Sequence, residues 1–272
     1  MYQRFASCCV ILVLALYGCS DSSDDWSTLE PDSPAAGVYI PSTFHPRGEP
    51  ALIGNTEAVI SPSGEAYLIM LDGPWFDEVI PLSIPYQVSG AIKVEGDTFV
   101  APSLRIYPDG KQDSDPLVAE GVFVRDDYIS ADYTWGDTQG QFHLRHSELN
   151  NEAPGLDKLE GLWGVIIGFV SPGGSFDNLH VTLTVYADGT AFGSDSTGCT
   201  YSGAFSLVGL QYNFYNLDLE LSSCGARDGD YKGLAFVGAC CGSEPRGQLL
   251  RFGTSSTNRS FNARLFGPNF AP

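Results

Sequence analysis

The sequence lacks the local patterns from which most catalytic and metal centres are built. It contains no Gly-x-Ser-x-Gly turn, His-Glu-x-x-His helix or glycine-rich phosphate loop. Histidine is scarce, and His45, His143, His146 and His180 are too scattered for a metal cluster. His143 and His146 lie three residues apart on an expected strand, so they point to opposite faces. We expect no catalytic residue, no metal and no cofactor, and we predict that the protein is not an enzyme.

Basic residues are also few. The chain has 14 Lys and Arg against 33 Asp and Glu, which gives a net charge of −19. Such a surface disfavours nucleic acids and anionic lipid headgroups as partners, and it favours cationic proteins or metal ions by long-range steering. The simpler interpretation, which is also the more common one, is solubility through mutual repulsion.

Long apolar runs after residue 19 and long helical patterns are absent. The composition instead includes Gly 31, Pro 17, Tyr 13 and Phe 16, which favours short strands joined by turns. About 250 residues follow the N-terminal leader, enough for one large or two ordinary domains. We therefore predict an all-β protein.

The leader is residues 1–18, with Arg4 as its positive end and an apolar run over 5–16. This run is shorter than the ~20 residues of a membrane-spanning helix. Leu16-Tyr17-Gly18-Cys19 resembles the lipobox of bacterial lipoproteins, although Tyr17 replaces the usual small residue. The resemblance implies cleavage before Cys19 and acylation of its thiol with chains such as palmitate, which hold a protein on a membrane. An ordinary secretory signal is the alternative.

Residues 19–36 form the predicted tether, which is polar, acidic and rich in proline, and so expected to stay extended. By resemblance to Gram-negative lipoproteins, Ser20 directs the protein to the outer membrane, because an Asp at that position would signal retention in the inner membrane. The expected location is the outer membrane, with the folded body facing the periplasm or the cell surface.

The body contains an internal repeat, in which residues 37–148 match residues 161–267 and residues 149–160 form a linker. A period of this length indicates duplicated domains. Four segments match in the same order: 59–67 with 185–192, 89–92 with 202–205, 120–124 with 232–237, and 140–145 with 247–251.

Each repeat is predicted to be a chain of hairpins. Asp188-Gly189 and Asp228-Gly229 are strong two-residue turn signals. Eight sequential strands per repeat fit a small up-and-down barrel, which removes exposed sheet edges. The predicted strands of the second repeat are 163–169, 180–186, 190–194, 199–208, 212–224, 230–237, 248–253 and 260–266. The fold prediction is two tandem eight-stranded up-and-down barrels.

A family resemblance supports this architecture. Gly161-Leu162-Trp163 is similar to the Gly-x-Trp signature of lipocalin-type barrels, the calycins. The resemblance implies that an arginine near the last strand packs over the tryptophan, and Arg264 has the matching position. The first repeat offers Gly37, Tyr39 and Arg145 instead, with Tyr in place of Trp. The chain departs from true lipocalins because it lacks their helix after the last strand.

The seven cysteines divide into four groups. Two leave with the leader, and Cys19 takes lipid. Cys199 starts a predicted strand and Cys224 ends its antiparallel neighbour, so we expect a disulfide between them, which an oxidising compartment permits. Cys240 and Cys241 fall in a turn at the opposite barrel end. They form either a vicinal disulfide that clamps the turn or two thiols with a redox or soft-metal role, and the clamp is the favoured interpretation.

Two further patterns have a functional and a structural interpretation. Asp109, Asp113 and Asp115 could hold calcium, but they lack the spacing of an EF-hand loop, and a solvated acidic loop is favoured. Large side chains expected to point inward could either line a ligand cavity or fill the barrel. These side chains are Phe205, Leu207, Phe214, Leu219 and Phe236.

The leading hypothesis is therefore a membrane-anchored bacterial lipoprotein with a non-enzymatic binding or envelope-structural role, which captures a cationic protein. In general character it resembles the acidic barrel lipoproteins that inhibit lysozyme. The alternative is a lipocalin-like carrier of a small apolar ligand, which needs a hollow barrel with an open mouth. A hydrolytic enzyme would require clustered acid and base groups, which the sequence does not show.

Overall fold

The computed structural model describes residues 32–41, 55–71, 86–108, 112–170, 176–239 and 248–267. The segment Asp32–Pro272 forms one compact unit. The predicted leader, Cys19 and residues 20–31 of the tether lie outside the described residues. Within the described part of the chain, no helix is long and apolar enough to cross a bilayer.

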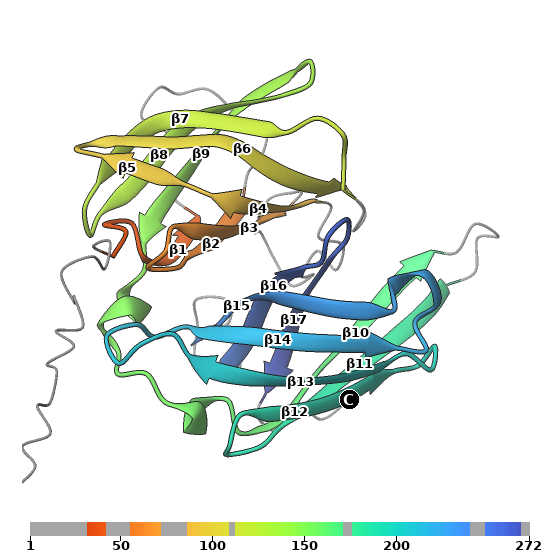
Figure 1. Ribbon diagram of the computed structural model, residues 1–272. Coiled ribbons are helices and arrows are strands. Elements are labelled where there is room, and N and C mark those ends of the chain that lie inside the picture. Colours follow the sequence, from red (N-terminus) through yellow and green to blue (C-terminus); the bar gives the residue numbers. More distant parts are fainter. Residues whose placement is uncertain are drawn as a thin grey trace, which may run out of the picture. The chain divides into compact units, whose positions relative to one another are not determined.

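The first repeat folds into a closed antiparallel barrel (Figure 1). Its ring closes where β1 pairs with β9. The β4 and β5 strands flank Ile92 and pair with opposite ends of β6, so they act as one strand of an eight-stranded barrel. The strands are β1 (Gly37–Pro41), β2 (Asn55–Ile60), β3 (Glu65–Leu71), β4 (Tyr86–Ala91), β5 (Lys93–Glu95), β6 (Thr98–Pro108), β7 (Leu117–Val124), β8 (Tyr128–Trp135) and β9 (Thr138–His146).

The second repeat forms another eight-stranded antiparallel barrel, in which each strand pairs with its sequence neighbours and β10 closes on β17. The two-barrel, all-β, up-and-down prediction is therefore confirmed. The strands are β10 (Gly161–Val170), β11 (Phe176–Val185), β12 (Thr190–Asp195), β13 (Thr200–Leu207), β14 (Tyr215–Ser222), β15 (Gly229–Ala239), β16 (Gln248–Ser255) and β17 (Ser260–Gly267).

Alternation along the strands sends one set of side chains into each barrel and the other set outward. The β14 strand shows this pattern plainly, because Tyr215, Leu217, Leu219 and Leu221 are buried while the residues between them are exposed. A different pattern occurs in β16, where every residue after Gln248 is buried. Both faces of that strand are therefore covered.

Two matched glycines show that the repeat is structural. Gly64 and Gly189 both have positive φ angles, 80° and 86°, which an L-residue rarely adopts. The Gly64 carbonyl accepts a hydrogen bond from the Ile92 N–H, and the Gly189 carbonyl accepts one from the Phe205 N–H, both at 2.8 Å. The first two sequence matches thus occupy equivalent positions in the two barrels.

A second matched pair, Gly121 in β7 and Gly233 in β15, permits close backbone approach. A Cβ atom on Gly121 would collide with the Ser130 carbonyl, and one on Gly233 would collide with the Gly253 carbonyl. The fourth sequence match is wrong. It aligns residues of β9, the eighth strand of its barrel, with residues of β16, the seventh strand of the other. The two segments therefore do not occupy equivalent positions in the two barrels.

The chain between the barrels is ordered by side-chain hydrogen bonds. It contains two short 3-10 helices, η2 (Glu148–Asn151) and η3 (Leu156–Lys158), and a third, η4 (Gly225–Arg227), follows β14. Asn150 accepts from the Val38 N–H and donates to the Val38 carbonyl, both at 2.8 Å, as a paired strand would. Asn213, next to the second barrel, donates to the Leu149 carbonyl at 3.1 Å. The connector is therefore bound to both barrels.

The start of the compact unit also contacts both barrels. The Ser33 N–H donates to the Pro62 carbonyl of the first barrel at 2.7 Å. The Asp32 carboxylate accepts from the Tyr212 hydroxyl, between β13 and β14 of the second barrel, at 2.7 Å.

Candidate functional site

The interior of the second barrel is filled with large side chains. Trp163 is fully buried, and its indole N–H donates to the Leu159 carbonyl at 2.7 Å. Tyr201 stacks on Phe261 with 5.4 Å between the ring centres. The hollow left among these side chains measures about 10 Å³, roughly the space of one water molecule. Its lining residues are Val181, Leu183, Tyr201, Leu219, Phe252, Phe261, Ala263 and Leu265.

The first barrel is packed in the same way. Phe142 contacts Phe99 edge-on, with ring centres 6.1 Å apart, and stacks on Tyr133 at 6.5 Å. Tyr39 meets the edge of His146 with ring centres 5.5 Å apart. Burial raises the pKa of Tyr39 and lowers the pKa of His146, against the opposing charge effect of Asp126 on the histidine. Both rings are therefore held in their neutral forms.

The structure places two of the expected inward residues elsewhere. Phe205 and Leu219 belong to the core of the second barrel, and Leu207 packs against it. Phe214 and Phe236 instead lie in a separate buried cluster with residues of the first barrel. In β15, Phe236 alternates with the inward Ala235 and Val237 and so must face outward.

The signature positions of the lipocalin resemblance fall on equivalent strands. Gly37 and Gly161 begin β1 and β10 with φ angles of 153° and 137°. Tyr39 and Trp163, two residues later, are both core residues. Arg145 is exposed on β9.

Arg264 has a role that the resemblance did not anticipate. It lies on β17 next to the inward Leu265, and its Nη2 is 2.7 Å from Oε2 of Glu57 in the first barrel. A second arginine, Arg251 on β16, places its Nε 3.1 Å from Oε1 of the same carboxylate. All three side chains are at most 6% exposed. We call Glu57, Arg251 and Arg264 the ionic lock.

Burial and charge act in opposite directions on the lock. Burial lowers the pKa of Arg251, and the Glu57 carboxylate opposes that shift. The Arg251 guanidinium also lies 5.3 Å from the centre of the Phe236 ring, a distance at which a cation is attracted to an aromatic face. The carboxylate thus joins two cations of the second barrel to the first barrel.

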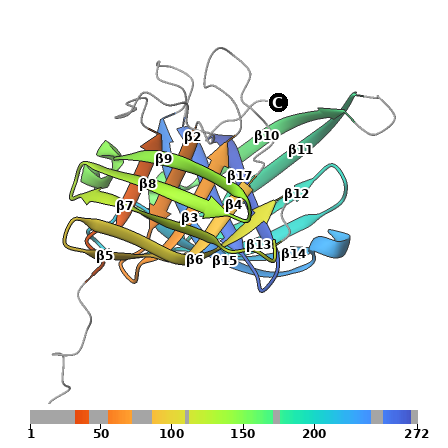
Figure 2. The ribbon, with the colours of Figure 1, turned by 90° about the horizontal axis from the view of Figure 1, so that it is seen from above.

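Apolar and polar contacts surround the lock and complete an interface between the barrels. In both ribbon views, β2 to β4 lie beside β15 to β17 (Figures 1 and 2). The Tyr67 hydroxyl donates to the Lys232 carbonyl at 3.0 Å, and Gln87 Nε2 donates to the Thr254 carbonyl at 2.9 Å. The buried apolar residues of this interface are Val38, Val59, Tyr67, Phe214, Leu234 and Phe236.

One signal for this interface is present in the sequence, at a point in β16 where alternation breaks down. Leu249 and Leu250 are consecutive apolar residues in a strand, so one of them must point out of the barrel. Both are buried, at 2% and 0% exposed. A strand that is apolar on both faces is covered on both faces.

Cys199 and Cys224 form a disulfide with a Cα–Cα distance of 4.5 Å, as strand direction predicts. Beside it, the buried Asp195 carboxylate accepts hydrogen bonds from the Thr197 hydroxyl at 2.5 Å and the Tyr201 hydroxyl at 2.6 Å. These contacts stabilise one end of the barrel. Of the other predicted cysteine sites, Cys19, Cys240 and Cys241 lie outside the described residues.

The acidic turn that was considered as a calcium site is held by a local hydrogen bond. Asp113 Oδ1 accepts from the Asp115 N–H at 2.9 Å, and Asp109 lies outside the described residues. In the described ranges, no group of three or more His, Cys, Asp or Glu side chains is arranged to hold a metal.

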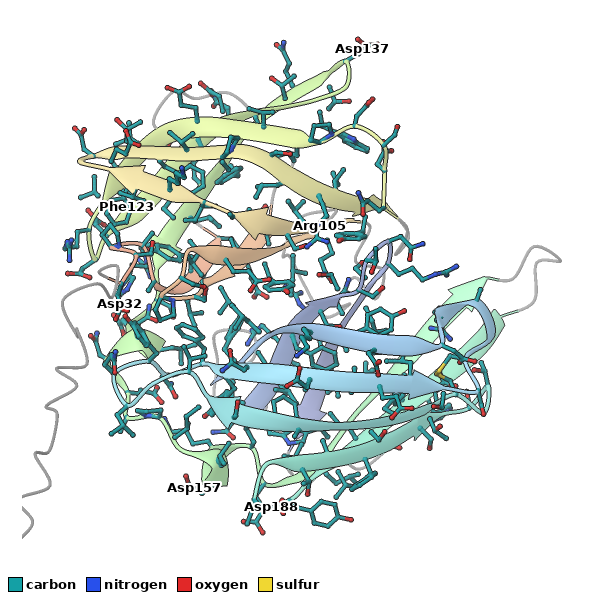
Figure 3. All side chains as sticks on the ribbon, viewed as in Figure 1. Asp32, Arg105, Phe123, Asp137, Asp157 and Asp188 are labelled. Carbon is teal, nitrogen blue, oxygen red and sulfur yellow. A yellow bond between two sulfur atoms is a disulfide. The ribbon has the colours of Figure 1, made fainter. Side chains whose placement is uncertain are left out.

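Exposed acidic residues form two cross-strand pairs. Glu120 in β7 is directly opposite Asp132 in β8, and Glu220 in β14 is directly opposite Asp230 in β15. All four are exposed. Like charges placed opposite each other destabilise a sheet. Other exposed aspartates include those labelled in Figure 3 at Asp137 and Asp188, which lie in turns, and at Asp157, which lies in η3.

No protein family model, curated protein sequence or solved structure matches this chain.

Proposed function

We propose that this protein is a membrane-anchored bacterial lipoprotein that binds a cationic protein on the outer surface of its two barrels. The observation that carries the proposal is the filling of both barrel interiors by aromatic and aliphatic side chains. Recognition then takes place on the outside of the barrels, where the chain's acidic residues lie. The relation of the two repeats to lipocalin-type barrels, from the Gly161 and Trp163 signature, is part of this proposal.

The packed interiors argue against the alternative of a small-ligand carrier. A site for such a ligand needs a cavity of about 300–1,000 Å³. The hollow inside the second barrel measures about 10 Å³. Phe252 and Phe261, which line it, are part of the aromatic packing that fills the barrel.

The acidic pairs support a cationic partner. The Glu120–Asp132 and Glu220–Asp230 pairs each carry repulsion in the free protein. A lysine or arginine side chain of a partner placed between the two carboxylates would relieve that repulsion. The net charge of −19 would also speed encounter with a positively charged protein.

The location forms part of the same proposal. The lipobox-like segment ending at Cys19 supplies the lipid anchor, Ser20 directs the protein to the outer membrane, and residues 20–36 hold the barrels away from the bilayer. Metabolic labelling with a palmitate analogue tests the anchor. Wild-type protein should be labelled and Cys19→Ala should not, and equal labelling of both would contradict the assignment.

The binding test uses the chain from Ser20 to Pro272, with lysozyme as a defined cationic probe and fully acetylated lysozyme as a control of the same size. We expect binding to native lysozyme that weakens as salt rises, and none to the acetylated form. The variant Glu120→Thr/Glu220→Thr should bind more weakly, whereas Asp157→Asn should bind as wild type does. A parallel pull-down from envelope extract extends the test to other cationic proteins. The proposal fails if no cationic protein binds and only small apolar molecules co-purify, which would favour the carrier.

A further inference from the structure

The interface between the barrels uses a different face of each repeat. We call the outward side chains of a barrel's first four strands its front face, and those of its last three strands its back face. The front face of the first barrel (β1 to β4) covers the back face of the second barrel (β15 to β17). The front face of the second barrel and the back face of the first barrel are not used in this contact.

The exposed apolar residues lie on these two remaining faces. Six of the eight large hydrophobic residues that are exposed in the described part of the chain occupy them. The exceptions are Tyr186, which directly follows β11 of the front face, and Leu210, in the segment between β13 and β14. The front-face residues are Leu162 and Phe192, at 41% and 56% exposed, and the back-face residues are Val118, Val122, Val124 and Tyr128, at 36% to 46%.

On the front faces, two matched positions carry large apolar side chains that are covered in the first barrel and exposed in the second. Val38 follows Gly37 and is fully buried by the interface, whereas Leu162 follows Gly161 and is 41% exposed. Tyr67 stands three residues after Gly64 and is 4% exposed. Phe192 stands three residues after Gly189 and is 56% exposed, beside the ring of Tyr186 at 6.2 Å. The second barrel therefore carries apolar side chains at two positions of the internal interface, on a face that no part of this chain covers among the described residues, whereas Val59 of the interface is matched by Thr184.

The back faces show the same relationship. Leu234 and Phe236, one and three residues after Gly233, are 4% and 2% exposed in the interface. Val122 and Val124, one and three residues after Gly121, are 46% and 36% exposed.

The arrangement of the ionic lock is not repeated on the free faces, although β9 of the back face carries the exposed Arg145. Glu57 stands seven residues before Gly64, and the matched residue seven before Gly189 is Thr182. In β8, the counterpart of the strand that holds Arg251, the outward residues are Tyr128, Ser130, Asp132 and Thr134, none of which is an arginine. A contact between the free faces would therefore contain no ion pair like the lock, and it would be weakened wherever it buried Glu120, Asp132 or Arg145 of the back face without a partner.

The free front face is also uncharged. Its described outward residues in β10 to β13 include no Asp, Glu, Lys or Arg, although the whole chain carries 47 such residues. The Glu120 and Asp132 carboxylates of the back face would thus meet no carboxylate among the described outward residues of the front-face strands. Charge repulsion does not act across this pair of faces, unlike the remainder of the acidic surface.

We propose that the front face of the second barrel docks on the back face of the first barrel of another copy of this chain, repeating the internal contact between molecules. The contact joins two different surfaces, so each bound copy presents a new free face, and the assembly grows as a row unless its geometry closes a ring. Without an ionic lock, the contact is weaker than the internal one. This inference does not depend on the cationic partner proposed above.

Sedimentation velocity on the chain from Ser20 to Pro272 tests the proposal over a range of protein and salt concentrations. We expect a sedimentation coefficient that increases with protein concentration, and more steeply at high salt, because salt screens the net repulsion. The variants Phe192→Glu and Val122→Glu each place a charge on one face and should each remain monomeric. Leu210→Glu, at the exposed hydrophobic residue away from both faces, should associate as wild type does.

A mixture of Phe192→Glu and Val122→Glu, in each of which one of the two faces can no longer dock, gives the decisive result. Phe192→Glu keeps a free back face and Val122→Glu keeps a free front face, so an equimolar mixture should form a one-to-one dimer that grows no further. Its mass should be about twice that of either variant alone. Self-association of either variant by itself would show pairing of like faces and overturn the proposal. So would wild-type protein that stays monomeric up to its solubility limit at high salt, with native circular dichroism in every sample.

Discussion

Glu57 and Arg264 are separated by 207 residues in the sequence, yet Oε2 of the carboxylate and Nη2 of the guanidinium lie 2.7 Å apart. The two side chains are 2% and 6% exposed. Because Arg251 contacts the other carboxylate oxygen, one glutamate of the first barrel compensates two arginines of the second. The stability of the interface should depend on this residue more than on any single apolar contact.

Replacing Glu57 by Gln should lower the free energy of unfolding by about 3–5 kcal/mol, because it leaves two buried guanidinium groups without their carboxylate. Urea unfolding followed by tryptophan fluorescence measures the loss. Glu120→Gln is the matched control, since it removes an exposed carboxylate that faces Asp132 and should be neutral or slightly stabilising. Equal effects of the two substitutions would contradict the role of the lock.

A triple variant separates charge from packing. Replacing Glu57, Arg251 and Arg264 together by Leu, Met and Leu should restore most of the stability lost in Glu57→Gln, because no buried charge then remains uncompensated. If the triple variant is as unstable as Glu57→Gln, the arginines stabilise the protein through contacts other than the lock.

Reduction of the Cys199–Cys224 disulfide should destabilise the second barrel. The bond closes a loop with a sequence separation of 25 residues. Because it restricts the denatured chain, it should stabilise the folded state by about 3 kcal/mol. The Cys199→Ala/Cys224→Ala variant should therefore unfold at a lower temperature than wild type, and a reductant should not lower its midpoint further. A reductant that lowers the midpoints of both proteins equally would indicate that another disulfide dominates.

Alanine at either matched glycine should weaken its barrel. A methyl group at Gly121 or Gly233 collides with the carbonyl of the neighbouring strand, and relief requires separating the two strands. We expect a loss of about 1–3 kcal/mol in each case. Similar losses of unfolding free energy, measured by chemical unfolding, would support the equivalence of β7 and β15. A loss at only one glycine would mean that the two repeats are equivalent at the Gly64 and Gly189 turns but not at these strands.

Acid should destabilise the protein through Asp195. Burial alone raises the pKa of this carboxyl, but hydrogen bonds from Thr197 and Tyr201 outweigh burial and hold the pKa below the ordinary value of 3.8. The unfolded chain therefore binds this proton at a higher pH than the folded chain does. The contribution to stability is complete above the ordinary value and is lost as pH falls toward the lowered pKa of the folded state.

The check is to compare unfolding free energies of wild type and Asp195→Asn from about pH 6 down to about pH 2. The difference between the two proteins should shrink below the ordinary carboxyl pKa. A difference that stays constant over the whole range would assign the effect to lost packing instead of ionisation.

The barrels could be predicted from the sequence because their signals are local. Alternation and turn residues such as Asp188-Gly189 define each hairpin, and hairpins in series close into a barrel that leaves no edge. The direction of two adjacent strands was enough to pair Cys199 with Cys224. Each of these inferences needs information only from neighbouring strands.

The interface could not be predicted in the same way. Alternation identifies which residues face outward, but it does not reveal which outward face another domain covers. Val38 and Leu162 have the same chemistry and the same position after a matched glycine, and only one of them is buried. The sequence predicts Phe236 inside the barrel, because a large apolar residue in a strand usually faces the core. In the structure Phe236 is instead buried by the other barrel.

The contacts of Asp32 and Ser33 have a mechanical consequence. A pull on the chain before Asp32 reaches the first barrel through the Ser33–Pro62 hydrogen bond and the second barrel through the Asp32–Tyr212 hydrogen bond. A force applied at this end is thus divided between the two barrels before it acts on any strand. The force needed to begin unfolding from this end should accordingly exceed the force that would peel a single barrel from its first strand.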